Sequence, residues 1–302
     1  MSYSTEGKSL MTILDMIRFG ISQARATELY YGHGTDNAVD DIFALVLETL
    51  HLPWDIDREL LQGRLTDEEK TRLLSRLEQR VIQQVPVPYI TQTAHFCGMR
   101  FYVDERALIP RSPIAELIQQ QFSPWANPDN VTRILDLCTG SGCIAIACCA
   151  AFPEAMVDAV DISDAALEVA AINRERHHMQ DQLQLIQSDG FTQVPEVLYD
   201  IIVSNPPYVA QEDMQVLPAE YRHEPILALE ADDNGLALVK QILQQAGQYL
   251  RETGILVIEV GLSEDALRNL YPEVPFVWLE FEHGGEGIFL LTAQSLREHF
   301  GV

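Results

Sequence analysis

The spacing of hydrophobic and polar positions changes near residue 85. Before that point it is typical of helices: in "NAVDDIFALVLETL", residues 37–50, apolar side chains recur at intervals of three and four. Residues 66–84 predict a second helix, because Thr66 followed by Glu69 forms a capping-box sequence ahead of an apolar stripe. We therefore expect a small helical N-terminal domain over residues 1–85, with substrate docking as its suspected role.

"PVPYI" at 86–90 interrupts the helical pattern, so we expect the domain boundary there. "QTAHFCGMRFYVD" then predicts two short strands that turn at Cys97–Gly98, and a helix is expected to begin near Pro113. We assign residues 86–110 to a β-hairpin linker and residues 111–302 to a second domain.

From residue 131 onward, strands and helices alternate. The expected strands are "TRILDL", "AMVDAVDI", "LQLIQSD", "YDIIVSN" and "GILVIEVG", and the expected helices are "SGCIAIACCAAF", "SDAALEVAAINRERH" and "LALVKQILQQAGQYL". This alternation is typical of an α/β fold with a doubly wound parallel sheet. The end of the chain differs, because "FVWLEFEH", a "GGEG" turn and "IFLLTA" predict an antiparallel β hairpin at one side of that sheet.

The charge is the informative part of the composition. The 302 residues carry a net charge of −25, and the excess is concentrated after residue 95, where 11 basic residues face 31 acidic ones. Such a surface repels phosphate backbones and attracts basic partners. We expect a basic protein partner and no direct binding of nucleic acid, although acidity can also serve solubility alone.

Two further features of the sequence concern the cellular compartment and the presence of a metal site. The longest nearly uncharged apolar run, "CIAIACCAAF", is about half of a membrane span, and "MSYSTEGKSL" has no signal-peptide pattern, so we expect a cytoplasmic protein without a membrane segment. The five cysteines form no C-x-x-C pair, and the eight histidines, His283 among them, show no metal-ligand spacing. No metal site is expected.

Glycines and acids follow the first three strands of the alternating region. "ILDLCTGSGCIAIA" places Gly140 and Gly142 in a strand-to-helix turn, where backbone can approach a ligand. Asp161 ends the next strand, where a carboxylate can accept both ribose hydroxyls, and Asp189 with Gly190 ends the third. A nucleoside-bearing cofactor is therefore expected at this edge of the sheet.

The identity of that cofactor depends on the fourth strand. "GSGCIA" fits the nicotinamide fingerprint, with Asp161 at a suitable distance. Against this, Asp136 precedes the loop, where it can anchor the turn or a cationic amino group, and "NPPY" follows the fourth strand, where hydride transfer has no evident use for it. Methyl transfer to an amino nitrogen does have such a use.

"NPPY" combines two acceptors with an aromatic ring. The side-chain oxygen of Asn205 and the carbonyl of Pro206 can accept the two N–H bonds of one NH₂ group and so favour a pyramidal, nucleophilic nitrogen. Tyr208 can stack on the plane of the amide or base, and the proton can leave after the nitrogen has become cationic. The rest of catalysis would be the alignment of the nitrogen with the methyl group for in-line attack.

At this point the sequence resembles the HemK-like protein-glutamine methyltransferases, a group of class I S-adenosylmethionine-dependent enzymes with a Rossmann-like sheet. The resemblance rests on the order and spacing of "FYVDERALIPRSPIAELI", "ILDLCTGSGCIAIA", "VDAVDIS", "QSDGF", "SNPPYV" and "EPILAL". It implies methyl transfer to a glutamine side-chain amide, with S-adenosylhomocysteine as the product, and Asn205, Pro206, Pro207 and Tyr208 as the glutamine slot. The residues implied to hold the cofactor are Asp136, Cys138, Thr139, Gly140, Ser141, Gly142, Asp161, Ile162, Asp189, Gly190, Phe191 and Asn205.

Two branches of this group compete. "PRSPIAEL" at 110–117 resembles the branch that modifies the third large-subunit ribosomal protein, whereas release-factor methylases carry "PRPxTE" there. The resemblance departs at Cys138, where the group has glycine and where we expect cysteine to avoid a glycine-only φ. Residues 228–236 are unusually acidic, and Glu224 and Asp232 are candidates to face a basic peptide.

Three other functions remain open. An adenine methyltransferase acting on DNA or RNA would also use "NPPY", but it predicts a basic groove, and "RERHH" at 174–178 is the nearest approach to one. A nicotinamide oxidoreductase and a non-enzymatic ribosome-assembly factor are the other two.

Overall fold

The computed structural model describes Tyr3, residues 6–282 and residues 284–301, and it separates the chain into two compact units. The helical unit consists of Met1–Ala94 together with two short pieces, Val103–Glu105 and Pro218–His223. The α/β unit consists of His95–Tyr102, Arg106–Leu217 and Glu224–Val302. The helical unit is therefore built from three separate stretches of sequence.

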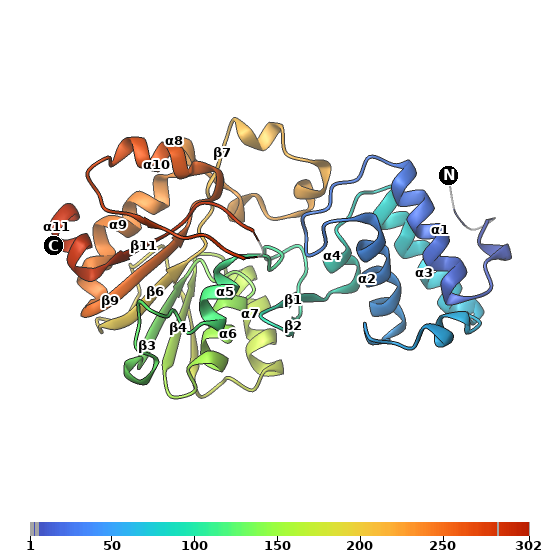
Figure 1. Ribbon diagram of the computed structural model, residues 1–302, viewed down its shortest axis with the longest axis horizontal. Coiled ribbons are helices and arrows are strands. Elements are labelled where there is room, and N and C mark those ends of the chain that lie inside the picture. The colour runs from blue at the N-terminus through green and yellow to red at the C-terminus, as the bar shows by residue number, and fades with distance from the viewer. Residues whose placement is uncertain (1–2, 4–5, 283, 302) are drawn as a thin grey trace. The chain divides into compact units, whose positions relative to one another are not determined.

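The helical unit packs amphipathic helices around one apolar core (Figure 1). Its helices are α1 (Ile13–Ala26), α2 (Ala38–Leu50), α3 (Asp67–Val81) and α4 (Val87–Thr91), with 3₁₀ turns at Glu6–Ser9, Arg58–Gln62 and Ala219–His223. The predicted capping box at Thr66 and Glu69 is confirmed, and a second one at Thr12 and Asp15 begins α1. Apolar side chains from α1, α2 and α3, such as Met16, Ile42 and Leu77, are fully buried.

The α/β unit contains a seven-stranded sheet in the order β10-β11-β9-β6-β3-β4-β5. Its strands are β3 (Arg133–Leu137), β4 (Met156–Asp161), β5 (Leu183–Gln187), β6 (Tyr199–Ser204), β9 (Leu250–Glu259), β10 (Val277–Trp278) and β11 (Ile288–Thr292). The strands from β5 to β9 are parallel, and β11 runs antiparallel between β9 and β10. The expected α/β class and the terminal antiparallel hairpin are confirmed.

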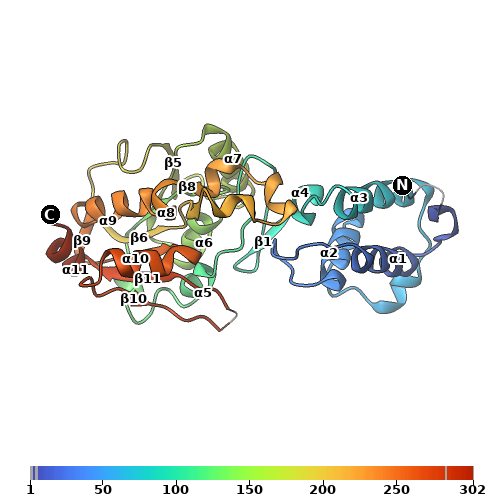
Figure 2. The ribbon, with the colours of Figure 1, turned by 90° about the horizontal axis from the view of Figure 1, so that it is seen from above.

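Helices cover both faces of this sheet, as Figures 1 and 2 show. One face packs on α5 (Ile114–Gln119), α6 (Cys143–Ala151) and α7 (Asp164–Arg176), and the other on α9 (Ala237–Tyr249), α10 (Glu264–Leu270) and α11 (Ala293–Phe300). Because both faces are covered, the central strands are apolar almost throughout rather than alternating. Cys143, Cys148 and Cys149 are buried in α6, as their apolar setting predicts.

Short elements complete the chain. They are β1 (Ala94–Phe96), β2 (Met99–Phe101), β7 (Val209–Ala210), β8 (Glu230–Ala231), α8 (Asp232–Gly235) and 3₁₀ turns at Pro128–Asn130, Asp213–Gln215, Ile226–Ala228 and Gly261–Ser263. The sequence pattern did not predict the helices α4, α8, α10 and α11, and it began β9 four residues too late, at Gly254. Within the described residues, no helix is both long and apolar enough to cross a membrane.

Candidate functional site

A cavity of about 340 Å³ opens at the carboxyl ends of β3, β4, β5 and β6. Ligands of doubly wound folds bind at this edge because the loops that follow parallel strands converge there. The cavity is lined by most of the predicted cofactor residues, namely Cys138, Thr139, Gly140, Ser141, Asp161, Ile162, Asp189, Gly190 and Asn205, and by Pro207 of the predicted glutamine slot. The motifs that the sequence separates by 70 residues thus form one site.

The loop after β3 takes the left-handed backbone that its glycines permit. The φ angles are 55° at Gly140 and 79° at Gly142, and a Cβ on Gly142 would lie 3.1 Å from the Cβ of Ala170. Cys138 also has a positive φ, of 61°, so our expectation that cysteine would avoid such an angle is wrong. The surrounding turn holds this residue in a conformation that costs a side chain about 1–2 kcal/mol.

Asp136 anchors this loop from below. Its side chain is fully buried, and its Oδ2 accepts hydrogen bonds from the Thr139 hydroxyl at 2.5 Å and from the Ala145 N–H at 3.1 Å. Its Oδ1 is buried and has no hydrogen-bond partner within the described chain. Burial raises the pKa of Asp136 to about 7, although both hydrogen bonds lower it. Of the two roles that the sequence allows, anchoring the turn is thus observed.

Asp161 connects the loops after β3 and β4. One carboxylate oxygen accepts the Gly140 N–H at 2.8 Å and the other accepts the Ser163 N–H at 2.9 Å. Each oxygen retains a second lone pair, so the carboxylate can still accept two hydroxyls. Burial raises the pKa of Asp161. Next to it, Ile162 is 49% exposed and presents an apolar surface to the cavity.

The donor set of this cavity fits S-adenosylmethionine. A vicinal diol suits the free lone pairs of Asp161, and a flat base suits the apolar surface of Ile162. The loop geometry at Gly140 keeps the backbone bare where the ligand must approach closely.

Asn205 follows β6 and lines the same cavity. The preceding Ser204 donates its hydroxyl to the Leu137 carbonyl at 2.8 Å, which ties the end of β6 to the end of β3. Within the described residues, the Asn205 side chain makes no hydrogen bond, so its amide oxygen is available as an acceptor. Asn205 is thus the acceptor that projects from the sheet edge beside the glycine loop.

Tyr208 is fixed from several directions. Its hydroxyl donates to Glu259 at 3.0 Å, and its carbonyl accepts the Ser263 hydroxyl at 2.9 Å. Gly261 leaves room for the ring, because a Cβ there would lie 2.6 Å from a ring carbon of Tyr208. Glu259 also accepts the Ser112 hydroxyl at 2.5 Å, and burial raises its pKa while both hydroxyls lower it. A buried carboxylate therefore fixes the tilt of the tyrosine ring.

Some predicted residues lie outside the cavity lining. Phe191 is buried and stacks on Tyr249, with ring centroids 4.6 Å apart, rather than facing the cavity. The predicted site residues Asp136, Gly142, Pro206 and Tyr208 do not line the cavity either.

The structure corrects the expectation for Glu224. This carboxylate is buried, receives two hydrogen bonds from the Arg111 guanidinium at 2.5 and 2.8 Å, and accepts the Ile109 N–H. It therefore does not face a basic peptide, whereas Asp232 is exposed.

The start of α9 lines the cavity through Ala237, Leu238 and Gln241 and was missed as part of the site. Two other missed segments of the wall carried a signal in the sequence. They are residues 106–112 and residues 225–228, the second of which contributes Pro225, Leu227 and Ala228. Both belong to stretches that carried the family resemblance, "ERALIPRSP" and "EPILAL", which was the available signal. Across the described chain, no cluster of three or more histidine, cysteine or acidic side chains is arranged to hold a metal ion, and His283 lies outside the described residues.

Comparison with known proteins identifies the family. Residues 118–220 match the model of the methyltransferase small domain. The ribosomal protein uL3 glutamine methyltransferase of Francisella tularensis subsp. tularensis is 48% identical over 95% of this chain and 92% of the relative. Its counterpart from Xanthomonas campestris pv. campestris is 50% identical over 96% of this chain and 94% of the relative.

The chain belongs to this methyltransferase family. It is an enzyme that uses S-adenosylmethionine as methyl donor, and its sheet is the Rossmann-like sheet of class I methyltransferases. Among solved structures, the catalytic domain of hMettl16 in complex with the MAT2A 3'UTR hairpin 6 has a TM-score of 0.49 and 19% identity over 74% of this chain and 81% of that one.

Proposed function

We propose that this chain transfers a methyl group from S-adenosylmethionine to the side-chain amide nitrogen of a glutamine in ribosomal protein uL3. The sulfonium supplies an electrophilic methyl group when the cofactor is bound. A nitrogen–carbon bond forms as the carbon–sulfur bond breaks, and the amide nitrogen then loses one proton. Asn205 and the Pro206 carbonyl hold the NH₂ group, with Pro207 and Tyr208 forming the rest of the slot.

The observation that carries this proposal is the position of Asn205. Among the residues that the structure describes, its side-chain amide has no hydrogen-bond partner, and Asn205 lines the cofactor cavity one residue beyond β6, whose end is tied to the end of β3. An acceptor there can orient a weakly nucleophilic nitrogen without acting as a base. We assign Asp161 to the ribose and the loop from Cys138 to Gly142 to the methionine part of the cofactor.

The assignment of uL3 as the substrate rests on the relatives and on charge. Both curated relatives are named for this substrate, and residues 96–302 carry 31 acidic against 11 basic side chains. We propose that this surface speeds encounter with a basic protein and disfavours nucleic acid. A ribosomal protein is met in the cytoplasm, where we place the enzyme.

The test is methyl transfer from labelled S-adenosylmethionine to purified uL3, with the modified residue mapped by mass spectrometry. We expect one added methyl group on a glutamine, and loss of transfer in Asn205→Ala. Asn269→Ala is the matched control, because Asn269 is an exposed asparagine on α10. Label on a release factor but not on uL3 would change the substrate. Label that nuclease removes from a cell lysate would overturn protein methylation, and normal turnover of Asn205→Ala would remove Asn205 from the mechanism.

A further inference from the structure

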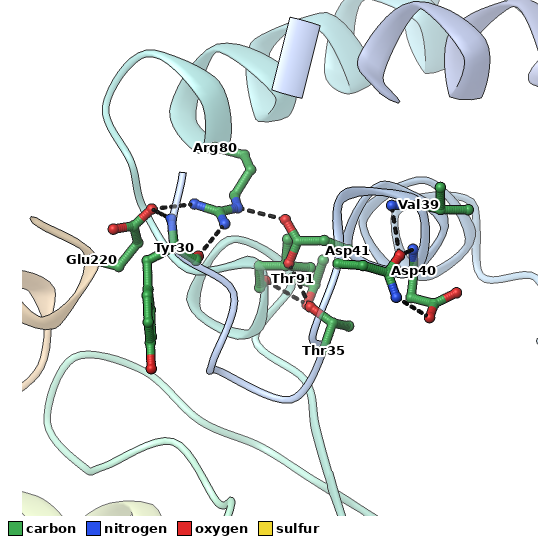
Figure 3. A network of polar contacts seen from close by, with 10 residues as sticks. Tyr30, Thr35, Val39, Asp40, Asp41, Arg80, Thr91 and Glu220 are labelled. Carbon is green, nitrogen blue, oxygen red and sulfur yellow. Dashed lines mark hydrogen bonds and ion pairs between the residues drawn. The ribbon is translucent and has the colours of Figure 1, made fainter. Parts of the chain in front are cut away.

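Each unit buries carboxylates that pair with an arginine. In the helical unit, Arg80 contacts Asp41 at 2.6 Å and Glu220 at 3.1 Å, and all three residues belong to that unit (Figure 3). In the α/β unit, Glu224 pairs with Arg111, and the two side chains are 0% and 21% exposed. The second pair concerns the cofactor cavity directly, because Arg111 lines it.

Glu224 holds one segment of the cavity wall through three hydrogen bonds. Its Oε1 accepts from Nη1 of Arg111 at 2.5 Å and from the Ile109 N–H at 3.1 Å, and its Oε2 accepts from Nη2 of Arg111 at 2.8 Å. Two bonds between one guanidinium and one carboxylate fix the angle between these groups as well as their distance. The third bond reaches the backbone, so Glu224 fixes the course of the chain at Ile109 in addition to one side chain.

Glu224 also begins a second segment of the wall, residues 225–228. Ile226 and Leu227 are 64% and 58% exposed, so burial of these two side chains contributes little to the position of the segment. At its far end, the carbonyl of Leu229 accepts an N–H of β7 at 2.8 Å. At its near end, the fixed point is the buried carboxylate of Glu224.

One buried carboxylate thus joins two wall segments that lie more than 100 positions apart in the sequence. A buried ion pair is weak evidence for stability, because the cost of desolvating the charges offsets most of their attraction. It does specify one arrangement, since any other arrangement leaves a buried charge unpaired. The pair of Glu224 and Arg111 therefore determines how the two segments lie relative to one another.

We propose that Glu224 is a positioning residue for the cofactor: by binding Ile109 and Arg111, it holds the wall segments 106–112 and 225–228 in the arrangement that binds S-adenosylmethionine. Glu224 acts through the residues that it holds. The inference deepens the proposed function, on which it rests for the assignment of this cavity to the cofactor.

The experiment compares Glu224→Gln with Asp158→Asn in the full chain. Asp158 is a matched control: its side chain is 2% exposed, and it pairs at 3.0 Å with Arg133, whose side chain is 30% exposed. It lies within β4, three residues before the end of that strand at the cavity. We measure binding of S-adenosylhomocysteine by calorimetry, hydrogen exchange of the Ile109 amide, and the free energy of unfolding in urea.

For Glu224→Gln we expect S-adenosylhomocysteine to bind about tenfold more weakly and the Ile109 amide to exchange faster. Asp158→Asn should also lower the free energy of unfolding, but it should leave binding and exchange at Ile109 unchanged. A guanidinium without its carboxylate would attract the carboxylate of S-adenosylhomocysteine and strengthen binding, so weaker binding reports position rather than charge. Unchanged or tighter binding in a folded Glu224→Gln variant, or an equal loss in both variants, would overturn the proposal.

Glu224→Asp is the second variant, for the case in which Glu224→Gln does not fold. It keeps the carboxylate but shortens the side chain by one methylene, so the ion pair with Arg111 can form only if the two wall segments move. We expect weaker binding of S-adenosylhomocysteine here too, and binding equal to that of the wild type would again contradict a positioning role.

These readouts need no acceptor protein. Failure of the chain to methylate uL3 would overturn the proposed substrate and leave this result intact. Failure of the wild type to bind S-adenosylhomocysteine would instead overturn the assignment of the cavity to the cofactor.

Discussion

Replacing Asp136 by asparagine is expected to change how the stability of the α/β unit depends on pH. Asp136 is fully buried, and its pKa rises from 3.8 to about 7 because burial disfavours the carboxylate. The folded protein therefore binds a proton here between pH 4 and 7 that the unfolded chain has already lost. Since stability falls with rising pH wherever the folded state binds more protons, the wild type loses stability across that window.

The size of this pH-dependent loss of stability follows from the shift in the pKa of Asp136. A difference of about three pKa units corresponds to about 4 kcal/mol, of which about 2 kcal/mol falls between pH 5 and 7 and about 3 kcal/mol between pH 5 and 8. Asparagine does not ionise, and its oxygen can still accept from the Thr139 hydroxyl and the Ala145 N–H, which both bond to Oδ2 of Asp136. If the amide changes the free energy of unfolding by an amount that does not depend on pH, this amount does not alter the difference in pH dependence between the two proteins.

The assay is urea denaturation at pH 5, 6, 7 and 8. Both proteins carry Trp54→Phe, so that fluorescence from Trp125 and Trp278 reports on the α/β unit. We expect the variant to gain about 3 kcal/mol relative to the parent between pH 5 and 8. Asp161 and Glu259, whose pKa values burial also raises, are present in both proteins and cancel. Parallel curves for the two proteins would refute ionisation of Asp136 with a raised pKa.

Three further predictions concern the loop and the tyrosine. Tyr208→Phe removes a hydrogen bond to the buried Glu259 and should lower the free energy of unfolding by about 1.5–3 kcal/mol. A urea midpoint equal to that of the wild type would contradict this prediction. Gly261→Ala places a Cβ 2.6 Å from the Tyr208 ring and should displace that ring. The KM for the acceptor protein should therefore rise about tenfold, while the affinity for S-adenosylhomocysteine stays constant. An unchanged KM would show that the position of the ring does not affect binding of the acceptor protein. Cys138→Gly relieves a φ of 61°, so we expect the free energy of unfolding to rise by up to about 1 kcal/mol, and a fall in melting temperature would count against strain at this position.

Local sequence patterns predicted the elements that local forces determine. The capping box at Thr66 satisfies helix-end N–H groups within four residues, and the apolar runs around β3 and β6 suit a strand that is buried on both faces. The cavity residues could be predicted for a related reason. Parallel strands end at one edge of the sheet, so Asp161 and Asn205 meet there although 44 positions separate them.

The missed features are long-range pairings between charged residues. Glu224 lies in an acidic stretch and was expected at the surface, but Arg111, 113 positions earlier, neutralises it in the interior. Arg80 and Glu220 are separated by 140 positions, and no periodicity links them. A helical pattern indicates which face of α3 is apolar, but it does not indicate which distant carboxylate meets the arginine at its end. α11 was missed because it follows directly on the apolar run of β11.

The place of β11 has a consequence for biosynthesis. β11 is the last strand of the chain, yet it lies between β9 and β10 in the sheet. Until Ile288–Thr292 has left the ribosome, one edge of β9 exposes unpaired N–H and C=O groups next to the apolar run Ile255–Ile258. An open, apolar strand edge invites pairing with other chains, so a stalled or truncated chain that ends before β11 should aggregate. Pairing of β11 with β9 and β10 therefore completes the sheet only after β10 has been made, and insertions are safer at the exposed Gly301, beyond α11, than within the hairpin of β10 and β11.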